Sequence, residues 1–262
     1  SAHEATSLLT ADVETVKALL SIAAQARHYR TGLPFVVAEL QDIRKLPVVG
    51  RAYPGPVEVV AGDATISRLM VQNLLHPGLS EIYNELLAGE DGNELYIRSG
   101  DSVGGLTLGE LAAQRPAVIV LGILKPDGAN WKVNLLAPSD TRIEVDDRVV
   151  LMARNYSETE PDSRQEPLPA ISRVTAAPRA YPVTASQHRV LVLGWNRRVP
   201  SLVAELSSYP GSDFEVEVVS VVPVAERERA IERYCGPESL VPCRHIEADY
   251  MVEEELRRMT PA

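Results

Sequence analysis

A proline-rich stretch between positions 155 and 187 constrains the fold of this chain more than any other feature. It carries five prolines among scattered Ser, Thr and Glu, and neither a helical nor a strand period persists through it. Because proline fixes φ and removes a backbone donor, such a stretch cannot form the interior of a helix or a sheet. It is also longer than connections inside compact domains. The sequence therefore predicts a linker that divides the chain into two parts.

The part after the linker, residues 188–262, alternates apolar runs with helical patterns. The predicted strands cover 189–194, 216–222 and 243–247, and the predicted helices cover 199–207, 226–234 and 252–259. Strands and helices that alternate in this way form parallel sheets with right-handed crossovers. We therefore expect a partial Rossmann-like subdomain of the α/β class, with a doubly wound parallel sheet.

Residues 1–92 predict an incomplete unit of the same class. The predicted elements are a helix at 12–27, strands at 35–39 and 57–61, and helices at 62–74 and 79–87. The stretch between the two strands is rich in proline and glycine and is expected to be a loop. A complete unit of this kind opens with a strand and a glycine turn. Neither is recognisable here, so the sequence predicts a partial Rossmann-like half.

Residues 93–154 predict a smaller lobe of the α+β type. The predicted strands at 94–98, 117–124, 131–136 and 148–153 are separated by turns, and one short helix is expected at 106–113. Strands joined by turns pair in antiparallel fashion, which separates this lobe from the parallel halves on either side. The predicted map is therefore a partial half at 1–92, the α+β lobe at 93–154, the linker at 155–187 and the second subdomain at 188–262.

Charge and composition exclude several classes of function. The net charge is −10 and the pI about 5.1, and no basic stripe is present, so we expect no nucleic-acid partner. No apolar stretch approaches the ~20 residues needed to cross a bilayer, and two cysteines without CxxC spacing indicate a reducing compartment. Because the histidines are scattered and the common hydrolase and metalloprotease motifs are missing, we expect no enzyme.

Five short motifs carry a resemblance to a known family. GLTLGEL at 105–111, VIVLGI at 118–123 and DDRVVL at 146–151 resemble, in that order, the C-terminal lobe of RCK domains, the TrkA-type regulators of potassium conductance. VLGWNRR at 192–198 and VPVAERER at 222–229 look like the corresponding region of the CASTOR/POLLUX ion-channel family. The resemblance covers nearly the whole chain outside the linker.

The resemblance implies a cytosolic, ligand-sensing regulatory module of an ion channel or ion-uptake system, placed at the cytoplasmic face of a membrane. It implies a membrane pore in the same longer protein. It also implies self-assembly as a homo-oligomer, expected to be a tetrameric gating ring. A ligand that prefers one arrangement of such a module shifts the equilibrium of the pore, which would couple ligand binding to pore opening.

The turn after the first strand of the second part is the first candidate ligand site. Its residues are Gly194, Trp195, Asn196, Arg197 and Arg198. A dinucleotide-binding turn needs three glycines so that the backbone can approach the pyrophosphate, and only one is present. The helix N-terminus and its arginines could still attract an anion or a nucleotide, NAD or an adenine nucleotide. The alternative is a tight turn with surface arginines. Glu226 is the nearest candidate for a ribose contact, or it offsets its own helix dipole.

Acidic clusters are candidate Ca²⁺ ligands, because the resembled family includes calcium-regulated members. The candidates are Glu144, Asp146 and Asp147, then Glu247 and Asp249, with Glu90 and Asp91 as a third cluster. Ca²⁺ takes six to eight oxygen ligands, and each cluster alone offers too few. A site would therefore be shared between lobes or subunits, and the alternative is that these acids are solvated residues in turns.

Two functions of other classes stay open. The first is an NAD-dependent oxidoreductase or another nucleotide-binding enzyme, since a fold alone does not fix function. The missing glycine fingerprint and the absence of a catalytic histidine weigh against it. The second is an architectural ring component without a ligand, which the degenerate turn at Gly194 would fit.

Overall fold

A computed structural model describes residues 2–88, 92–128, 130–160, 186–209, 212–236 and 241–259. The chain forms two compact units, Ser1–Pro77 with Tyr181–Ala262, and Gly78–Ala180. The sequence map separates 1–92 from 188–262, whereas most of these two segments pack together in the first unit. Of the predicted linker at 155–187, residues 161–185 lie outside the described residues, as do Glu90 and Asp91. Its ends differ from the prediction, because Tyr156–Thr159 form a 3-10 turn and a strand begins at Ser186.

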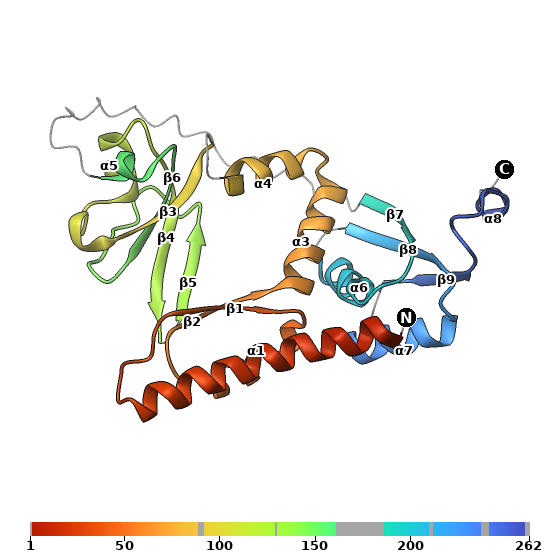
Figure 1. The fold of residues 1–262 in the computed structure, drawn as a ribbon. Helices are drawn as coiled ribbons and strands as arrows, with labels where there is room; N and C mark the ends of the chain where they lie inside the picture. The colour runs from red at the N-terminus through yellow and green to blue at the C-terminus, as the bar shows by residue number, and fades with distance from the viewer. Residues whose placement is uncertain are drawn as a thin grey trace. The chain divides into compact units, whose positions relative to one another are not determined.

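The first segment of the first unit contains a two-stranded parallel sheet (Figure 1). Its elements are α1 (Ala2–His28), β1 (Val36–Leu40), η1 (Ile43–Lys45), α2 (Leu46–Ala52), β2 (Val57–Ala61) and α3 (Gly62–Leu75). The predicted loop between the strands is wrong, because η1 and α2 fill much of it. Pro47 lies in the first turn of α2, where a missing N–H leaves no bond unmade. The Asp42 carboxylate starts η1 by accepting from the Arg44 backbone N–H at 3.0 Å.

One hydrophobic cluster fixes α1 and α2 to this sheet. Leu19 and Ala23 of α1 pack with Leu40 of β1 and with Val49 and Tyr53 at α2, and all five are buried. The Tyr53 hydroxyl donates to the Pro34 carbonyl oxygen. The short sheet is thus stable only as a layer against its helices, since two strands alone are marginal in water.

The second segment of the first unit forms a three-stranded parallel sheet. Its elements are β7 (Ser186–Leu193), α6 (Arg198–Ser208), β8 (Ser212–Ser220), α7 (Val224–Cys235), β9 (Cys243–Glu247) and α8 (Glu253–Met259). The strand order is β7-β8-β9, with Val190 opposite Val216 and Val216 opposite Cys243. The Rossmann-like α/β class is confirmed. Right-handed connections in this order place α6 and α7 on the same face, and both contribute to one core.

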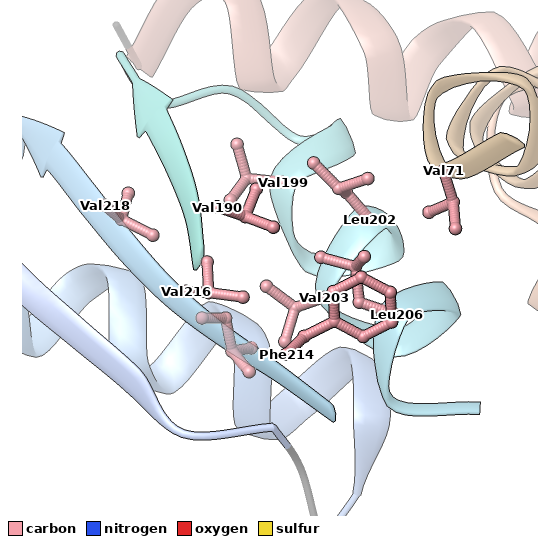
Figure 2. Packing of buried hydrophobic residues seen from close by; sticks show 10 residues of the cluster. Val71, Val190, Val199, Leu202, Val203, Leu206, Phe214, Val216 and Val218 are labelled. Atoms are coloured by element: carbon pink, nitrogen blue, oxygen red, sulfur yellow. The ribbon is translucent and has the colours of Figure 1, made fainter. Parts of the chain in front are cut away.

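The core of this sheet extends into the first segment (Figure 2). Val203 and Leu206 of α6 face Val216 and Val218 of β8, and Val71 of α3 packs on α6 from the other side. All five are almost completely buried. Apolar burial contributes about 25 cal/mol per Å², so closing Val71 and its neighbours against α6 stabilises the pairing of the two segments.

A buried polar network joins the same two segments. The Asp63 carboxylate, 3% exposed at the start of α3, accepts the Tyr234 hydroxyl of α7 at 2.7 Å. Its other oxygen accepts the backbone N–H groups of Ile43 at 3.1 Å and of Ala64 at 2.7 Å. The Arg44 guanidinium lies over the Tyr234 ring, 4.5 Å from its centroid. The buried carboxylate is therefore fully partnered, as burial of a charge requires.

The second unit contains an antiparallel lobe of the α+β type, together with a helix that the sequence map placed in 1–92. Its elements are α4 (Leu79–Ala88), β3 (Glu94–Ser99), η2 (Gly100–Ser102), α5 (Leu108–Gln114), β4 (Ile119–Asp127), β5 (Asn130–Leu135), β6 (Arg148–Ala153) and η3 (Tyr156–Thr159). The strands form an antiparallel sheet in the order β3-β6-β4-β5. Thr107 and Glu110 form a capping box that starts α5. Leu108 and Leu111 of α5 then cover one face of the sheet.

Gly122 marks the closest approach between two strands of this lobe. The pairing of β4 with β6 shifts register between Val120 and Gly122. A Cβ atom at position 122 would overlap the Asn134 carbonyl oxygen of β5. The residue is therefore a glycine because the neighbouring backbone occupies the space of a side chain.

Gly122→Ala is expected to lower the free energy of unfolding by about 1–3 kcal/mol, because β4 and β5 must separate to admit a methyl group. Gly50→Ala is the matched control, since nothing lies within 4 Å of a Cβ at that helical position. It should be neutral or stabilising by up to about 1 kcal/mol. Urea unfolding followed by circular dichroism measures both, and equal effects would contradict the close approach.

Tyr234→Phe is expected to cost about 1–3 kcal/mol of stability, because the Asp63 carboxylate loses a buried donor. Tyr209→Phe is the control, since within the described part of the chain its hydroxyl makes no hydrogen bond and its ring packs against Phe214. Burial, helped by the Asp63 carboxylate, raises the pKa of Tyr234 to about 12.

That raised pKa predicts a pH window. The contribution of Tyr234 to stability is complete below pH 10, the ordinary tyrosine value, and is lost as pH rises from about 10 towards about 12. Stability curves of the unmodified chain and of Tyr234→Phe should therefore converge across this window. Curves that stay parallel would show that the hydroxyl is not held neutral by the fold.

Candidate functional site

Three turns meet at the carboxyl edge of the β7-β8-β9 sheet, the edge where parallel α/β sheets bind ligands. They are residues 194–197, 221–223 and 248–252, which follow β7, β8 and β9. The Gly194 N–H donates to the Val219 carbonyl oxygen at 2.8 Å, and the Ala248 N–H donates to Ser220 at 3.2 Å. These bonds bring the predicted residues Gly194–Arg198 and Glu247–Asp249 to one edge.

Gly194 is required at its position on two grounds. Its φ is +94°, in the region that favours glycine. A Cβ atom there would also lie 3.1 Å from the Tyr250 hydroxyl oxygen. In a dinucleotide-binding turn a glycine leaves room for the pyrophosphate, whereas here Tyr250 of the third turn lies against it. The geometry therefore favours a closed strand-to-helix turn.

Asn196 occupies the backbone donors at the start of α6. Its side-chain Oδ1 accepts the Arg198 N–H at 2.8 Å, and its carbonyl oxygen accepts the Val199 N–H at 3.1 Å. Trp195 packs partly buried against the core, while Arg198 is exposed. An anion at this helix start would have to displace Asn196, because an N-terminal N–H that is already bonded offers little to a ligand.

Arg197 links the turn to the first segment of the same unit. Its guanidinium donates to the Gln41 side-chain oxygen at the end of β1. The Gln41 N–H donates to the Asp12 carboxylate at 2.7 Å, and Lys45 pairs with the same carboxylate at 2.6 Å. Asp12 is 2% exposed. Arg197 is thus half-buried and belongs to a series of polar contacts that extends from α1 to α6.

Sequence reasoning missed Asp12, and a signal was available. Asp12 stands one turn before Val16 and Leu19 on the apolar stripe of α1. A charged residue at a stripe position is expected to be buried with partners. Asp63 lies at the start of the helix predicted at 62–74, and nothing in the local sequence indicates its bond to Tyr234.

The acids at this edge have different surroundings. Glu226 is exposed in the first turn of α7, where a carboxylate offsets the helix dipole. The Glu247 carboxylate accepts the Val224 N–H at 3.4 Å, at the start of the same helix. Asp249 accepts the Met251 N–H at 2.9 Å within its own turn. Glu247 and Asp249 therefore serve the backbone of the turns in this structure.

Arg227 was missed because it lies in a strongly charged helix. Its side chain is completely buried, with Nη1 donating to the Val218 carbonyl at 2.9 Å and Nη2 to Ile246 at 3.1 Å. Burial lowers the pKa of Arg227, against a smaller opposing effect of Glu247. Burial, with the neighbouring Arg227 charge, also lowers the pKa of His245. The guanidinium binds the ends of β8 and β9 together.

The remaining candidate metal ligands lie in the second unit. Asp147 is 3% exposed, and its carboxylate accepts from the Lys125 ammonium at 3.0 Å and from the Glu144 N–H at 2.9 Å. Glu144 and Asp146 are exposed. Among the described residues, no group of three or more His, Cys, Asp or Glu side chains could hold a metal ion. Glu90 and Asp91 lie outside that part of the chain.

None of the helices formed by the described residues combines the length and the apolar character that a membrane crossing needs.

Comparison with known proteins identifies the relatives of this chain. Residues 63–168 match a family described as "Castor and Pollux, part of voltage-gated ion channel". The ion channel POLLUX of Lotus japonicus is 27% identical over 223 residues, which cover 84% of this chain and 23% of that protein. The ion channel CASTOR of the same plant is 27% identical over 221 residues, which cover 84% of this chain and 25% of that protein. The chain thus spans about a quarter of these relatives.

A solved structure shares the fold. The human SLO3 gating ring superposes with a TM-score of 0.56 at 11% identity, covering 94% of this chain and 50% of that one. At this identity the likeness concerns the fold alone. The expected family resemblance is confirmed by the match to residues 63–168 and by the aligned channels. The chain is therefore similar to the CASTOR and POLLUX ion channels over most of its length.

Proposed function

We propose that this chain is a cytosolic ligand-sensing module that couples ligand binding to the opening of an ion-channel pore. The observation that carries the proposal is the alignment of 84% of the chain with the ion channels POLLUX and CASTOR. The shared fold with a channel gating ring supports it. The pore would belong to the same longer protein, because the chain spans only about a quarter of either relative. The module would lie at the cytoplasmic face and assemble into a homo-oligomeric ring, expected to be tetrameric.

The carboxyl edge of the β7-β8-β9 sheet is the proposed ligand site. Arg197 connects its first turn to Gln41, and Glu247 connects its third turn to the start of α7. A ligand that takes over either contact changes how the turn is bonded to its neighbours. A ligand shifts a conformational equilibrium only by its difference in affinity between two states. The bonds of Arg197 and Glu247 would supply that difference.

Ca²⁺ is the first ligand that we propose. Glu247 and Asp249 lie at this edge, and the hydrogen bonds that both accept within the described part of the chain come from backbone N–H groups. Two carboxylates fall short of the six to eight oxygens that Ca²⁺ takes. Further ligands would come from a neighbouring subunit, for which the exposed Glu144 and Asp146 are candidates.

The alternative function is an NAD-dependent oxidoreductase or another nucleotide-binding enzyme. Tyr250 against Gly194 and Asn196 at the start of α6 both occupy space that a pyrophosphate would need. A nucleotide that acts as a regulator without turnover stays compatible with the proposal. It would bind through Arg197, Arg198 and Glu226 after the turn has opened.

A thermal-shift panel with Ca²⁺, Mg²⁺, NAD, NADH and adenine nucleotides tests the proposal. A ligand at 100 times its Kd stabilises the folded state by about 2.7 kcal/mol, which raises the Tm by about 5–10 °C for a chain of this size. We expect such a shift with one of these ligands and no turnover of it. Hydride transfer from NADH to a substrate would overturn the proposal, and no shift with any of them would favour a purely architectural ring component.

Glu247→Gln separates Ca²⁺ binding from structure at the proposed site. Glutamine keeps an oxygen that can accept the Val224 N–H but removes the charge that a cation needs. We expect the Tm without ligand to change little and the Ca²⁺-induced shift to fall by more than half. Glu215→Gln is the control, because Glu215 lies on β8 near the opposite edge of the sheet. An equal loss in both variants would point to a general charge effect.

A further inference from the structure

Among the described residues of the second unit, the face of the antiparallel sheet that lies opposite α5 is almost entirely apolar. We call this the outer face. The strand register assigns to it Leu95, Ile97 and Ser99 of β3, Arg148, Val150 and Met152 of β6, Ile119, Gly122, Leu124 and Pro126 of β4, and Trp131, Val133 and Leu135 of β5. The opposite face carries the core residues that pack under α5.

Five apolar side chains of the outer face are open to solvent, whereas Leu124 and Val150 on its two inner strands are buried. Leu95, Ile97, Ile119, Val133 and Leu135 are each between 51% and 59% exposed. An antiparallel sheet with one free face normally alternates apolar residues inward with polar residues outward. The outer face of this sheet is apolar where a free face would be polar, so its sequence pattern is that of a covered face.

Strand β5 departs most clearly from the usual alternation, in which apolar residues face the core and polar residues face the solvent. Asn134 pairs with Ile123 on the face that carries the core, whereas Val133 pairs with Leu124 on the outer face. Lys132 and Asn134 thus place polar groups on the core side of the edge strand, and Trp131, Val133 and Leu135 turn outward. Burial of the outer face explains this arrangement. A strand whose outer face met the solvent would place its polar residues outward and its apolar residues toward the core.

The charge on the outer face narrows the kind of partner. Arg148 is its single charged residue, and its guanidinium lies 4.1 Å from the centroid of the Trp131 ring. One cation that is already placed over an aromatic ring cannot hold a phosphate backbone or a lipid surface, which need several. A flat apolar surface without acids fits another flat apolar surface.

We propose that the outer face is an interface between two copies of this chain. The exposed side chains offer on the order of 500 Å² per copy, so a pair would bury on the order of 1,000 Å², the lower limit for a specific protein interface. In a twofold dimer both copies contribute the same surface to the interface. An apolar surface is complementary to a second copy of itself. Two sheets stacked in this way lie about 10 Å apart, as in a β-sandwich. The contact deepens the self-assembly within the proposed function and identifies its surface.

Val133→Asp tests the interface in the whole chain. An aspartate at the centre of a dry contact must lose its hydration, so we expect dimer dissociation to shift to concentrations at least about 10-fold higher. Asn134→Asp is the matched control, with a carboxylate gained at the next position of the same strand on the opposite face. Sedimentation velocity from about 1 to 100 µM, the range expected for an interface of this size, measures the masses.

Three results would overturn the proposal: a monomer throughout this range, a dimer that Val133→Asp leaves unchanged, or equal weakening by Asn134→Asp. Ile97→Asp on β3 provides a second variant in case Val133→Asp unfolds, which circular dichroism reports. In the unmodified chain, hydrogen exchange should slow in β3 and β5 as concentration rises. The interface is tested by the masses without ligand, whereas ligand sensing is tested by the Tm shift of the unmodified chain, so failure of the one is distinguishable from failure of the other.

Discussion

The packing of α3 against α6 joins two parallel sheets that are each too small to stand alone. The sheet of β1 and β2 has two strands and that of β7, β8 and β9 has three, and short sheets need a helical layer to be stable. Val71 supplies this layer from the first segment by entering the core of the second. The segments are separated in sequence by the whole α+β lobe and the proline-rich stretch. Their union therefore depends on burial at one helix pair and not on local chain connection.

Polar contacts give this union its specificity. Apolar side chains of similar size can slide past one another at modest cost, whereas Asp63 must meet the Tyr234 hydroxyl and Arg197 must meet Gln41. Both bonds cross between the two segments. A buried carboxylate that loses its partner is strongly destabilising. Arrangements of the two segments that separate Asp63 from Tyr234 are therefore less stable than the native arrangement.

Much of the fold could be predicted from sequence because its elements follow local periodicity. The strand at 57–61 and the strand at 243–247 have the predicted bounds, and the capping box at Thr107 makes α5 recognisable. Helix α2 was missed because Pro47 was interpreted as a loop signal, although proline is well placed in a first helical turn. The bond of Asp63 to Tyr234 joins residues far apart in the chain, and no local pattern encodes it. The candidate turn at Gly194 could be located from sequence, but its closure by Tyr250 could not.

Arg227 ties two neighbouring strands through their carbonyl oxygens, and no carboxylate of the described residues forms an ion pair with it. Its charge is therefore balanced by oriented peptide dipoles, which lose their effect within a small displacement. Sliding β9 along β8, or lifting α7 off the sheet, would leave a bare cation in an apolar setting at a cost of several kcal/mol. The bonds of Arg227 therefore oppose any displacement of β8, β9 and α7 relative to one another.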